Sequence, residues 1–163
     1  MREPSYMIVI PEKQDDIHDP GVFLSNLEKS DFITLTDTNM DEGRGLIIDL
    51  SVEDRTYKLC VYPTMVQIPN YVRSIHSFSR KESEKLDAAE SGLAVTMDFS
   101  GDTARCFHDQ LRIIDAMFPE ILAVLDCPSE KILSGKWVAL AAGSKTLPSP
   151  RYLFTVQAVS DES

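Results

Sequence analysis

One group of oxygen-bearing side chains has the residue types and spacing that a calcium ion needs. Asp37, Asn39 and Asp41 alternate ahead of Gly43, and Asp49 follows that glycine by six residues. Calcium loops place oxygen ligands at alternate positions, then a glycine for the bend, then a carboxylate six residues later. The glycine comes one residue late here, and the flanks read as strands. The alternative is therefore a connecting turn over residues 37–45, in which Asp, Asn and Gly suit the backbone.

A second candidate consists of Asp98 and Asp126, each of which follows or ends a predicted strand. Residues 93–99 alternate between apolar and other residues, and residues 121–125 are apolar throughout, as in an interior strand. If the two strands are parallel neighbours, both carboxylates lie at one carboxyl edge of the sheet, where open α/β sheets bind ligands. Two carboxylates there could hold Mg²⁺ for a metal-dependent enzyme. The alternative is helix capping after the first strand and a turn at Asp126.

The elements that must position these aspartates form a strand–helix–strand unit from Gly92 to Leu125. Apolar residues step by three and four along residues 102–118, which predicts the strongest helix in the chain, ended by Pro119. The polar residues of this helix share the opposite side: Arg105, His108, Asp109, Arg112 and Asp115.

The remaining segments predict further strands and short helices. Strands are expected at 6–10, 32–36 and 152–159, and an antiparallel hairpin at 46–52 and 57–61. Helices are expected from Asp19–Pro20, from the capping-box sequence Ser79–Glu82 to a stop at Gly92, and at 136–142, with a turn near 129–133. The hairpin excludes an all-parallel sheet. We therefore expect an α+β fold: a mixed β-sheet of about six to seven strands with three to four helices packed mainly on one face.

The length of 163 residues fits one domain over 1–163. Two lobes, 1–70 and 76–163, are the alternative. The chain stops about one turn beyond a predicted strand, which could be a natural end or the point where a larger protein is cut at a domain boundary.

Composition and net charge limit the classes of partner and the cellular compartment that we expect for this protein. The hydrophobic content of 43% and charged content of 26% are ordinary for a globular protein. The formal net charge is −10 and no basic patch is found, so nucleic acid and membrane surfaces are poor partners. Three widely separated cysteines fit a reducing compartment, and the apolar run 7–10 is too short for a signal peptide. We expect a cytoplasmic protein.

No complete catalytic set is found. His18, His76 and His108 are scattered, and the chain has no Cys-x-x-Cys pair. We therefore assign no catalytic, cofactor-binding or metal-binding residue and favour a non-catalytic protein-interaction or assembly module, with an unknown protein partner or self-association. The alternatives are the enzyme using Asp98 and Asp126 and the calcium loop at 37–41.

Four segments together carry a family resemblance: Tyr6–Pro11, Met97–Asp102, Leu133–Val138 and Tyr152–Val159. The chain resembles an uncharacterised bacterial family, domain of unknown function 4026. The resemblance covers essentially the whole chain and implies the amino-terminal part of longer bacterial relatives. It implies no functional residue, because the family has no established activity.

Overall fold

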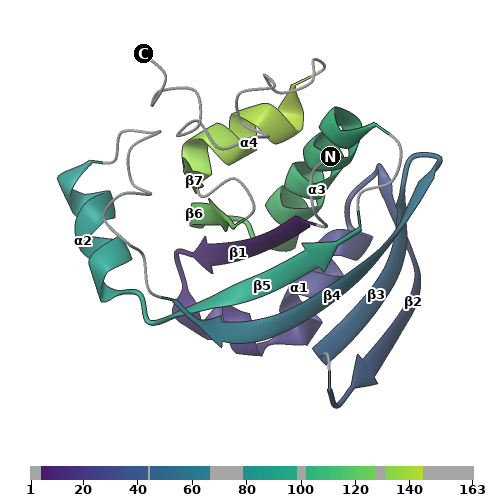
Figure 1. Ribbon diagram of the computed structural model, residues 1–163, viewed down its shortest axis with the longest axis horizontal. Coiled ribbons are helices and arrows are strands. Elements are labelled where there is room, and N and C mark those ends of the chain that lie inside the picture. The colour runs from purple at the N-terminus through teal and green to yellow at the C-terminus, as the bar shows by residue number, and fades with distance from the viewer. Residues whose placement is uncertain (1–4, 44, 67–78, 99–101, 128–130, 145–163) are drawn as a thin grey trace, which may run out of the picture.

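The computed structural model describes residues 5–43, 45–66, 79–98, 102–127 and 131–144 (Figure 1). These ranges contain seven strands: β1 (Ser5–Pro11), β2 (Ile33–Asp41), β3 (Gly45–Val52), β4 (Arg55–Met65), β5 (Ser91–Met97), β6 (Ile121–Asp126) and β7 (Lys131–Ser134). They also contain a 3-10 helix and four α-helices: η1 (Gln14–His18), α1 (Pro20–Glu28), α2 (Arg80–Ala88), α3 (Thr103–Met117) and α4 (Gly135–Gly143). The expected α+β fold is confirmed.

All seven strands belong to one sheet, in the order β2-β3-β4-β5-β1-β6-β7, and every neighbouring pair is antiparallel. The expectation of a mixed sheet is wrong in this respect. β5 and β6 do run in the same direction within one sheet, as the strand–helix–strand unit predicted. They are not neighbours, because β1 lies between them and pairs antiparallel with both.

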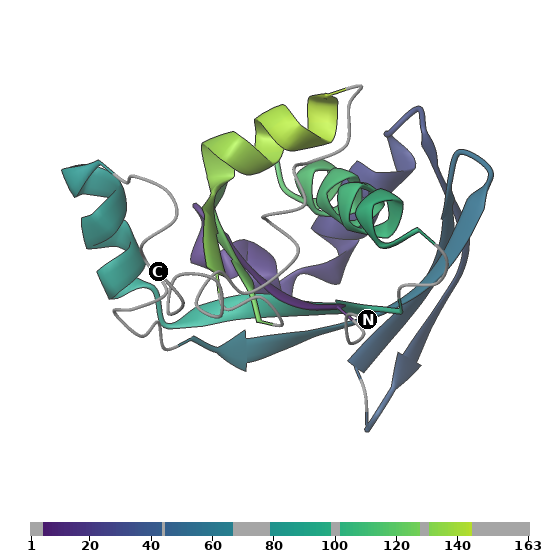
Figure 2. The same ribbon diagram turned by 45° about the horizontal axis from the view of Figure 1, so that its top comes forward.

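Three helices cover one face of the sheet. Figure 2 shows α1, α3 and α4 on this side, with the β2–β3 end of the sheet curling up beside α3. The main apolar core fills the space between, and its largest fully buried side chains include Phe23, Phe107 and Phe118. This arrangement confirms that the helices pack mainly on one face.

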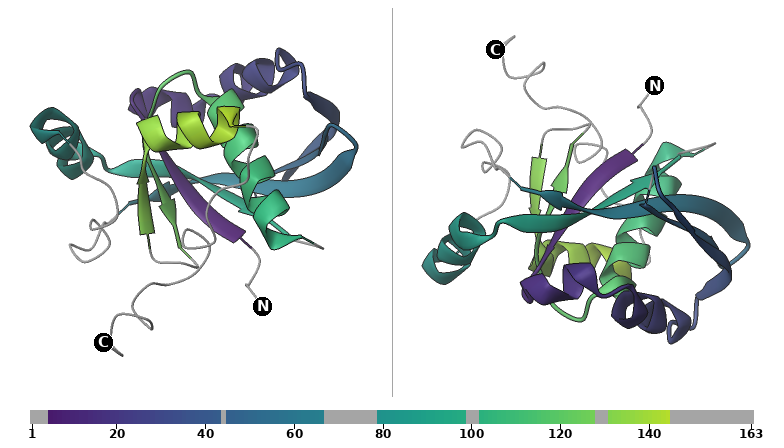
Figure 3. Two further views of the ribbon diagram at one scale, coloured as in Figure 1. Left: turned by 90° about the horizontal axis from the view of Figure 1, so that it is seen from above. Right: turned by 90° about the horizontal axis from the view of Figure 1, so that it is seen from below.

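Helix α2 stands apart from the other helices (Figure 3). Its buried residue, Leu86, joins a second and smaller apolar cluster that includes Ile8 and Leu125. Strand alternation places those two residues on the opposite face of the sheet from Val9 and Val124, which belong to the main core. The sheet therefore has an apolar cluster on each face.

Local signals located several boundaries correctly. The capping box at Ser79 and Glu82 is present in both directions, and the Asp102 carboxylate accepts hydrogen bonds from the N–H groups of Ala104 and Arg105. Asp19 precedes α1 as expected, but its side chain makes no capping hydrogen bond.

Three local expectations are wrong or untested. Gly92 lies inside β5 rather than stopping α2, and a Cβ there would lie 2.5 Å from Ile8 Cγ2, so close packing explains the glycine. Residues 131–134 form strand β7 rather than part of a turn. The expected strand at 152–159 lies outside the described residues.

Candidate functional site

The structure does not bring Asp98 and Asp126 together. Met7 of β1 is the register partner of both Val95 on β5 and Asp126 on β6, so these three residues lie in one row across the sheet. Asp98 lies three residues further along the chain than Val95 and is therefore outside that row. Two strand spacings of about 4.8 Å and three rises of about 3.4 Å place the two Cα atoms about 14 Å apart. Two ligands of one Mg²⁺ ion must each approach it to about 2.1 Å. The expected shared acidic rim depended on the two strands being neighbours, which is wrong.

Asp126 occupies a buried position in the sheet. It is fully buried, whereas Asp98 is exposed. Its register partner on β7 is Lys131, which is only 4% exposed. The register therefore places opposite charges on adjacent strands, a cross-strand combination that stabilises antiparallel sheets.

The three residues of the candidate calcium loop lie on a strand. β2 continues through Asp41, so the expected turn over 37–45 is shorter and begins at Glu42. Asp37, Asn39 and Asp41 alternate along this strand and therefore project from one face, with Cα atoms about 6.8 Å apart. A calcium loop instead wraps its ligands around the ion at about 2.3–2.6 Å. Pairing of β2 with β3 overrides the local preference of Asp, Asn and Gly for turns.

Within the described ranges, no three His, Cys, Asp or Glu side chains converge in a group that could hold a metal ion. Cys60, Cys106 and Cys127 form no disulfide.

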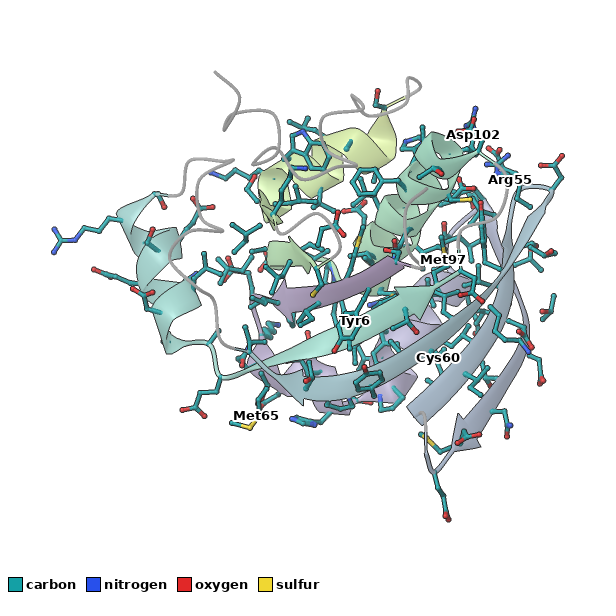
Figure 4. All side chains as sticks on the ribbon, in the orientation of Figure 1. Tyr6, Arg55, Cys60, Met65, Met97 and Asp102 are labelled. Carbon is teal, nitrogen blue, oxygen red and sulfur yellow. The ribbon has the colours of Figure 1, made fainter. Side chains whose placement is uncertain are left out.

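A polar cluster surrounds Asp109 of α3, which is fully buried. Its carboxylate accepts hydrogen bonds from Arg55 Nε at 2.6 Å, Arg55 Nη2 at 3.0 Å and the Tyr57 hydroxyl at 2.5 Å. Arg112 Nη1 lies 3.6 Å from the same carboxylate. In Figure 4, Arg55 lies at the end of the sheet that curls up beside α3. The cluster thus ties α3 to the β3–β4 hairpin.

The electrostatics of this cluster match a structural ion-pair network. Burial and the hydrogen bond to Asp109 raise the pKa of Tyr57 above its ordinary value, and the same carboxylate raises the pKa of Arg55. Both shifts hold the groups in the protonation states that bond to Asp109. Arg112 also stacks on Phe32, with its guanidinium carbon 4.1 Å from the ring centroid. The donors of this cluster are directed at the carboxylates of Asp109, Glu53 and Asp54.

Sequence reasoning placed Asp109 and His108 on the polar side of the helix, away from the main apolar row. Both are buried. A second apolar row, formed by Cys106, Ile113 and Met117, could have shown that α3 packs against more than one layer.

His108 lies on the side of α3 that faces α4. Its Nε2–H donates to the carbonyl of Ala141 at 2.9 Å, and its Nδ1 is buried without a hydrogen-bond partner. Burial lowers the pKa of His108, so the ring is neutral at pH 7. The contact joins two helices, α3 and α4.

A cavity of about 360 Å³ opens between α2, α4 and the end of α3. Its charged lining residues are Glu12, Glu82, Lys85, Asp115, Glu120 and Lys136. Several of these charges are already used within the protein: Lys85 Nζ lies 2.8 Å from Glu12, and Glu82 completes the capping box of α2. We assign no site to this cavity.

The outer edge of β2 is an exposed edge of the sheet in the part of the chain that the structure describes. β2 ends the strand order, and no neighbouring strand covers this edge among the described residues. Of its nine residues, Thr34 and residues 36–40 are exposed, and Met40 has 63% of its surface accessible. The opposite end of the sheet differs, since β7 is only four residues long and buried. We take the outer edge of β2 as the candidate functional site.

The described part of the chain defines an antiparallel α+β protein with one main helical layer and an exposed edge strand. The chain belongs to the family described as "Protein of unknown function (DUF4026) N-terminal", whose model matches residues 5–148. The expected family is thereby confirmed. No curated protein and no solved structure matches the chain. None of the helices in the described ranges has both the length and the apolar character needed to cross a membrane.

Proposed function

We propose that this domain is a non-catalytic, cytoplasmic protein-interaction module that binds an extended segment of a partner protein along β2. The observation that carries the proposal is the nine-residue outer edge of β2, whose side chains are largely exposed. In strand addition, an extended peptide pairs with such an edge, and its backbone hydrogen bonds supply affinity.

The length of β2 supports this proposal. Edge strands in monomeric proteins are commonly short or carry charged side chains, proline or bulges that discourage pairing. β2 carries two aspartates and a register shift between Leu35 and Asp37, but it is nine residues long and contains no lysine, arginine or proline. The strand behind it is firmly held, since β3 pairs with both β2 and β4. A partner would therefore meet a preformed template.

A pair of proline variants tests the proposal. Neighbouring N–H groups in a strand point to opposite edges, so one of Thr38→Pro and Asn39→Pro removes an outward N–H while leaving the β2–β3 ladder intact. Thermal melting identifies that variant as the more stable one. Strand-forming peptides selected from a display library should bind the wild type and lose binding to this edge-blocked variant.

Hydrogen exchange of the backbone amides tests the proposed binding along β2 independently. Binding should slow the exchange of backbone amides in β2, because outward N–H groups become paired. Selected peptides that bind the edge-blocked variant equally well, or that protect amides only outside β2, would overturn the proposed function.

A further inference from the structure

We infer that the segment binding along β2 is basic, with Lys or Arg at alternate positions separated by apolar residues. This inference rests on the proposed function. It commits to the chemistry of the partner strand, which strand addition alone does not specify.

The face of β2 that points away from the helices is acidic. Val52, Leu50 and Ile48 of β3 belong to the main core on the helix side, and their register partners on β2 are Ile33, Leu35 and Thr38. Asp37, Asn39 and Asp41 therefore project from the opposite face, where Asp49 of β3 also lies. Basic side chains on an added strand would lie directly beside this row.

The register contains an electrostatic conflict that such a partner would relieve. Asp37 lies opposite Asp49, and like charges in directly opposed positions destabilise a sheet. Lys58 Nζ lies 3.9 Å from Asp49, but Lys58 is on β4, two strand spacings from Asp37. A cation on a strand added outside β2 would be only one spacing of about 4.8 Å from Asp37.

The helix-side face of β2 explains the alternation with apolar residues. Met40 projects on that side, since its register partner Leu46 belongs to the main core. With 63% of its surface exposed, Met40 is one of the exposed large hydrophobic residues of the fold. Residues of the partner that alternate with its basic positions would lie next to Met40 and cover it.

The same charges disfavour a second copy of this chain. Two β2 strands paired antiparallel about Asn39 would set each Asp37 opposite the Asp41 of the other copy. Each copy also carries a formal net charge of −10. Like charges would therefore meet both across the new ladder and between the molecules.

Three nine-residue peptides provide the direct test: alternating Lys and Val, alternating Thr and Val, and alternating Glu and Val. We expect the Lys–Val peptide to bind about tenfold more tightly than the Thr–Val peptide, and the Glu–Val peptide to bind most weakly. The preference should shrink as salt screens the charges. A fully N-methylated Lys–Val peptide keeps its charges but lacks the strand N–H groups, and it should not bind. Binding of the methylated peptide at full strength would overturn the inference.

Neutralised variants assign the preference to β2. In Asp37→Asn/Asp41→Asn, the new amide oxygen at position 41 can still accept the hydrogen bond that Asp41 Oδ1 accepts from the Gly43 N–H, so the turn is kept. This variant should bind Lys–Val and Thr–Val peptides about equally. The matched control, Asp15→Asn/Asp16→Asn, removes the same charge from η1, whose main contacts are with β5, β1 and α1. The control should keep the tenfold preference.

The outcomes separate the two proposals. If Lys–Val and Thr–Val peptides bind equally well to the wild type and both fail on the edge-blocked proline variant, strand addition stands and the basic partner is wrong. If no peptide binds, the proposed function fails as well. An unchanged preference in Asp37→Asn/Asp41→Asn, or a dimer in size-exclusion chromatography that the edge-blocked variant abolishes, would also overturn the inference.

Discussion

Asp109→Asn should be among the most destabilising conservative changes in this protein. The wild-type carboxylate is fully buried and accepts three hydrogen bonds from Arg55 and Tyr57. Asparagine has nearly the same volume, but it carries no charge and directs an NH₂ group toward donors. The substitution therefore leaves donor groups facing donor groups without creating a cavity.

The expected size follows from how each donor can recover. The Arg55 side chain is 28% exposed and already lies near Glu53 and Asp54, so it can turn toward them and water. The Tyr57 hydroxyl is buried and keeps only the weak contact to Cys106 Sγ at 3.9 Å. Removing one partner of a buried ion pair lowers the free energy of unfolding by about 3–5 kcal/mol, and the exposure of Arg55 places this case at the lower end, at about 3 kcal/mol.

Urea unfolding at pH 7 measures this free energy. For a chain of this size, about 3 kcal/mol corresponds to a fall in Tm of about 6–12 °C. Tyr57→Phe alone should lower the free energy of unfolding by about 1.5 kcal/mol. The double variant should be less destabilised than the sum of the two single changes by at least about 1 kcal/mol, because both remove the same contact. A loss below about 0.5 kcal/mol for Asp109→Asn, or strict additivity, would refute the reasoning.

Three further changes follow from the same structure. Asp115→Asn should raise the free energy of unfolding by about 0.5 kcal/mol at pH 7, since burial raises the pKa of Asp115 and the carboxylate lies near the negative end of α3. Urea titrations should show this gain shrink as the pH falls and vanish below about pH 3, where the carboxyl is protonated in both the folded and the unfolded chain. Burial lowers the pKa of His108, so the unfolded chain binds a proton more readily than the folded chain, and the free energy of unfolding should fall as the pH drops below about 6.5. The difference between the urea midpoints at pH 7.5 and pH 5.5 should therefore be smaller in His108→Gln than in the wild type. An unchanged difference would contradict this. Gly135→Ala should lower the free energy of unfolding by about 3 kcal/mol, because the new Cβ would lie 1.7 Å from the Ile121 carbonyl oxygen. Gly143→Ala, whose Cβ would have no atom within 4 Å, should raise it by about 0.5 kcal/mol. Equal Tm values for these two variants would contradict the close packing at Gly135.

Local periodicity was sufficient to predict most elements of the fold. Alternation located β3, β4 and β5, and the steps of three and four located α3, since these patterns depend only on which side chains share a face. The α+β class and the packing of helices mainly on one face followed from them. The capping box at Ser79 was also readable, because all its atoms lie within four consecutive residues.

Strand neighbours could not be predicted in the same way. The position of β1 between β5 and β6 joins residues near 8 with residues near 94 and 125. Nothing within any one of these strands records which other strand it pairs with. The predicted approach of Asp98 to Asp126 was wrong for this reason.

At the candidate site on β2, too, some features follow from the sequence and others only from the tertiary structure. The sequence alone determined that Asp37, Asn39 and Asp41 alternate and that the chain is strongly acidic. Only the tertiary structure decided that these residues extend an edge strand rather than wrap into a loop, because pairing with β3 supplies backbone hydrogen bonds that outweigh the local turn preference. Burial of Asp109 was likewise a tertiary result. A charged residue can enter a core only where partners such as Arg55 and Tyr57 meet it, and here they come from a hairpin about fifty residues earlier in the chain.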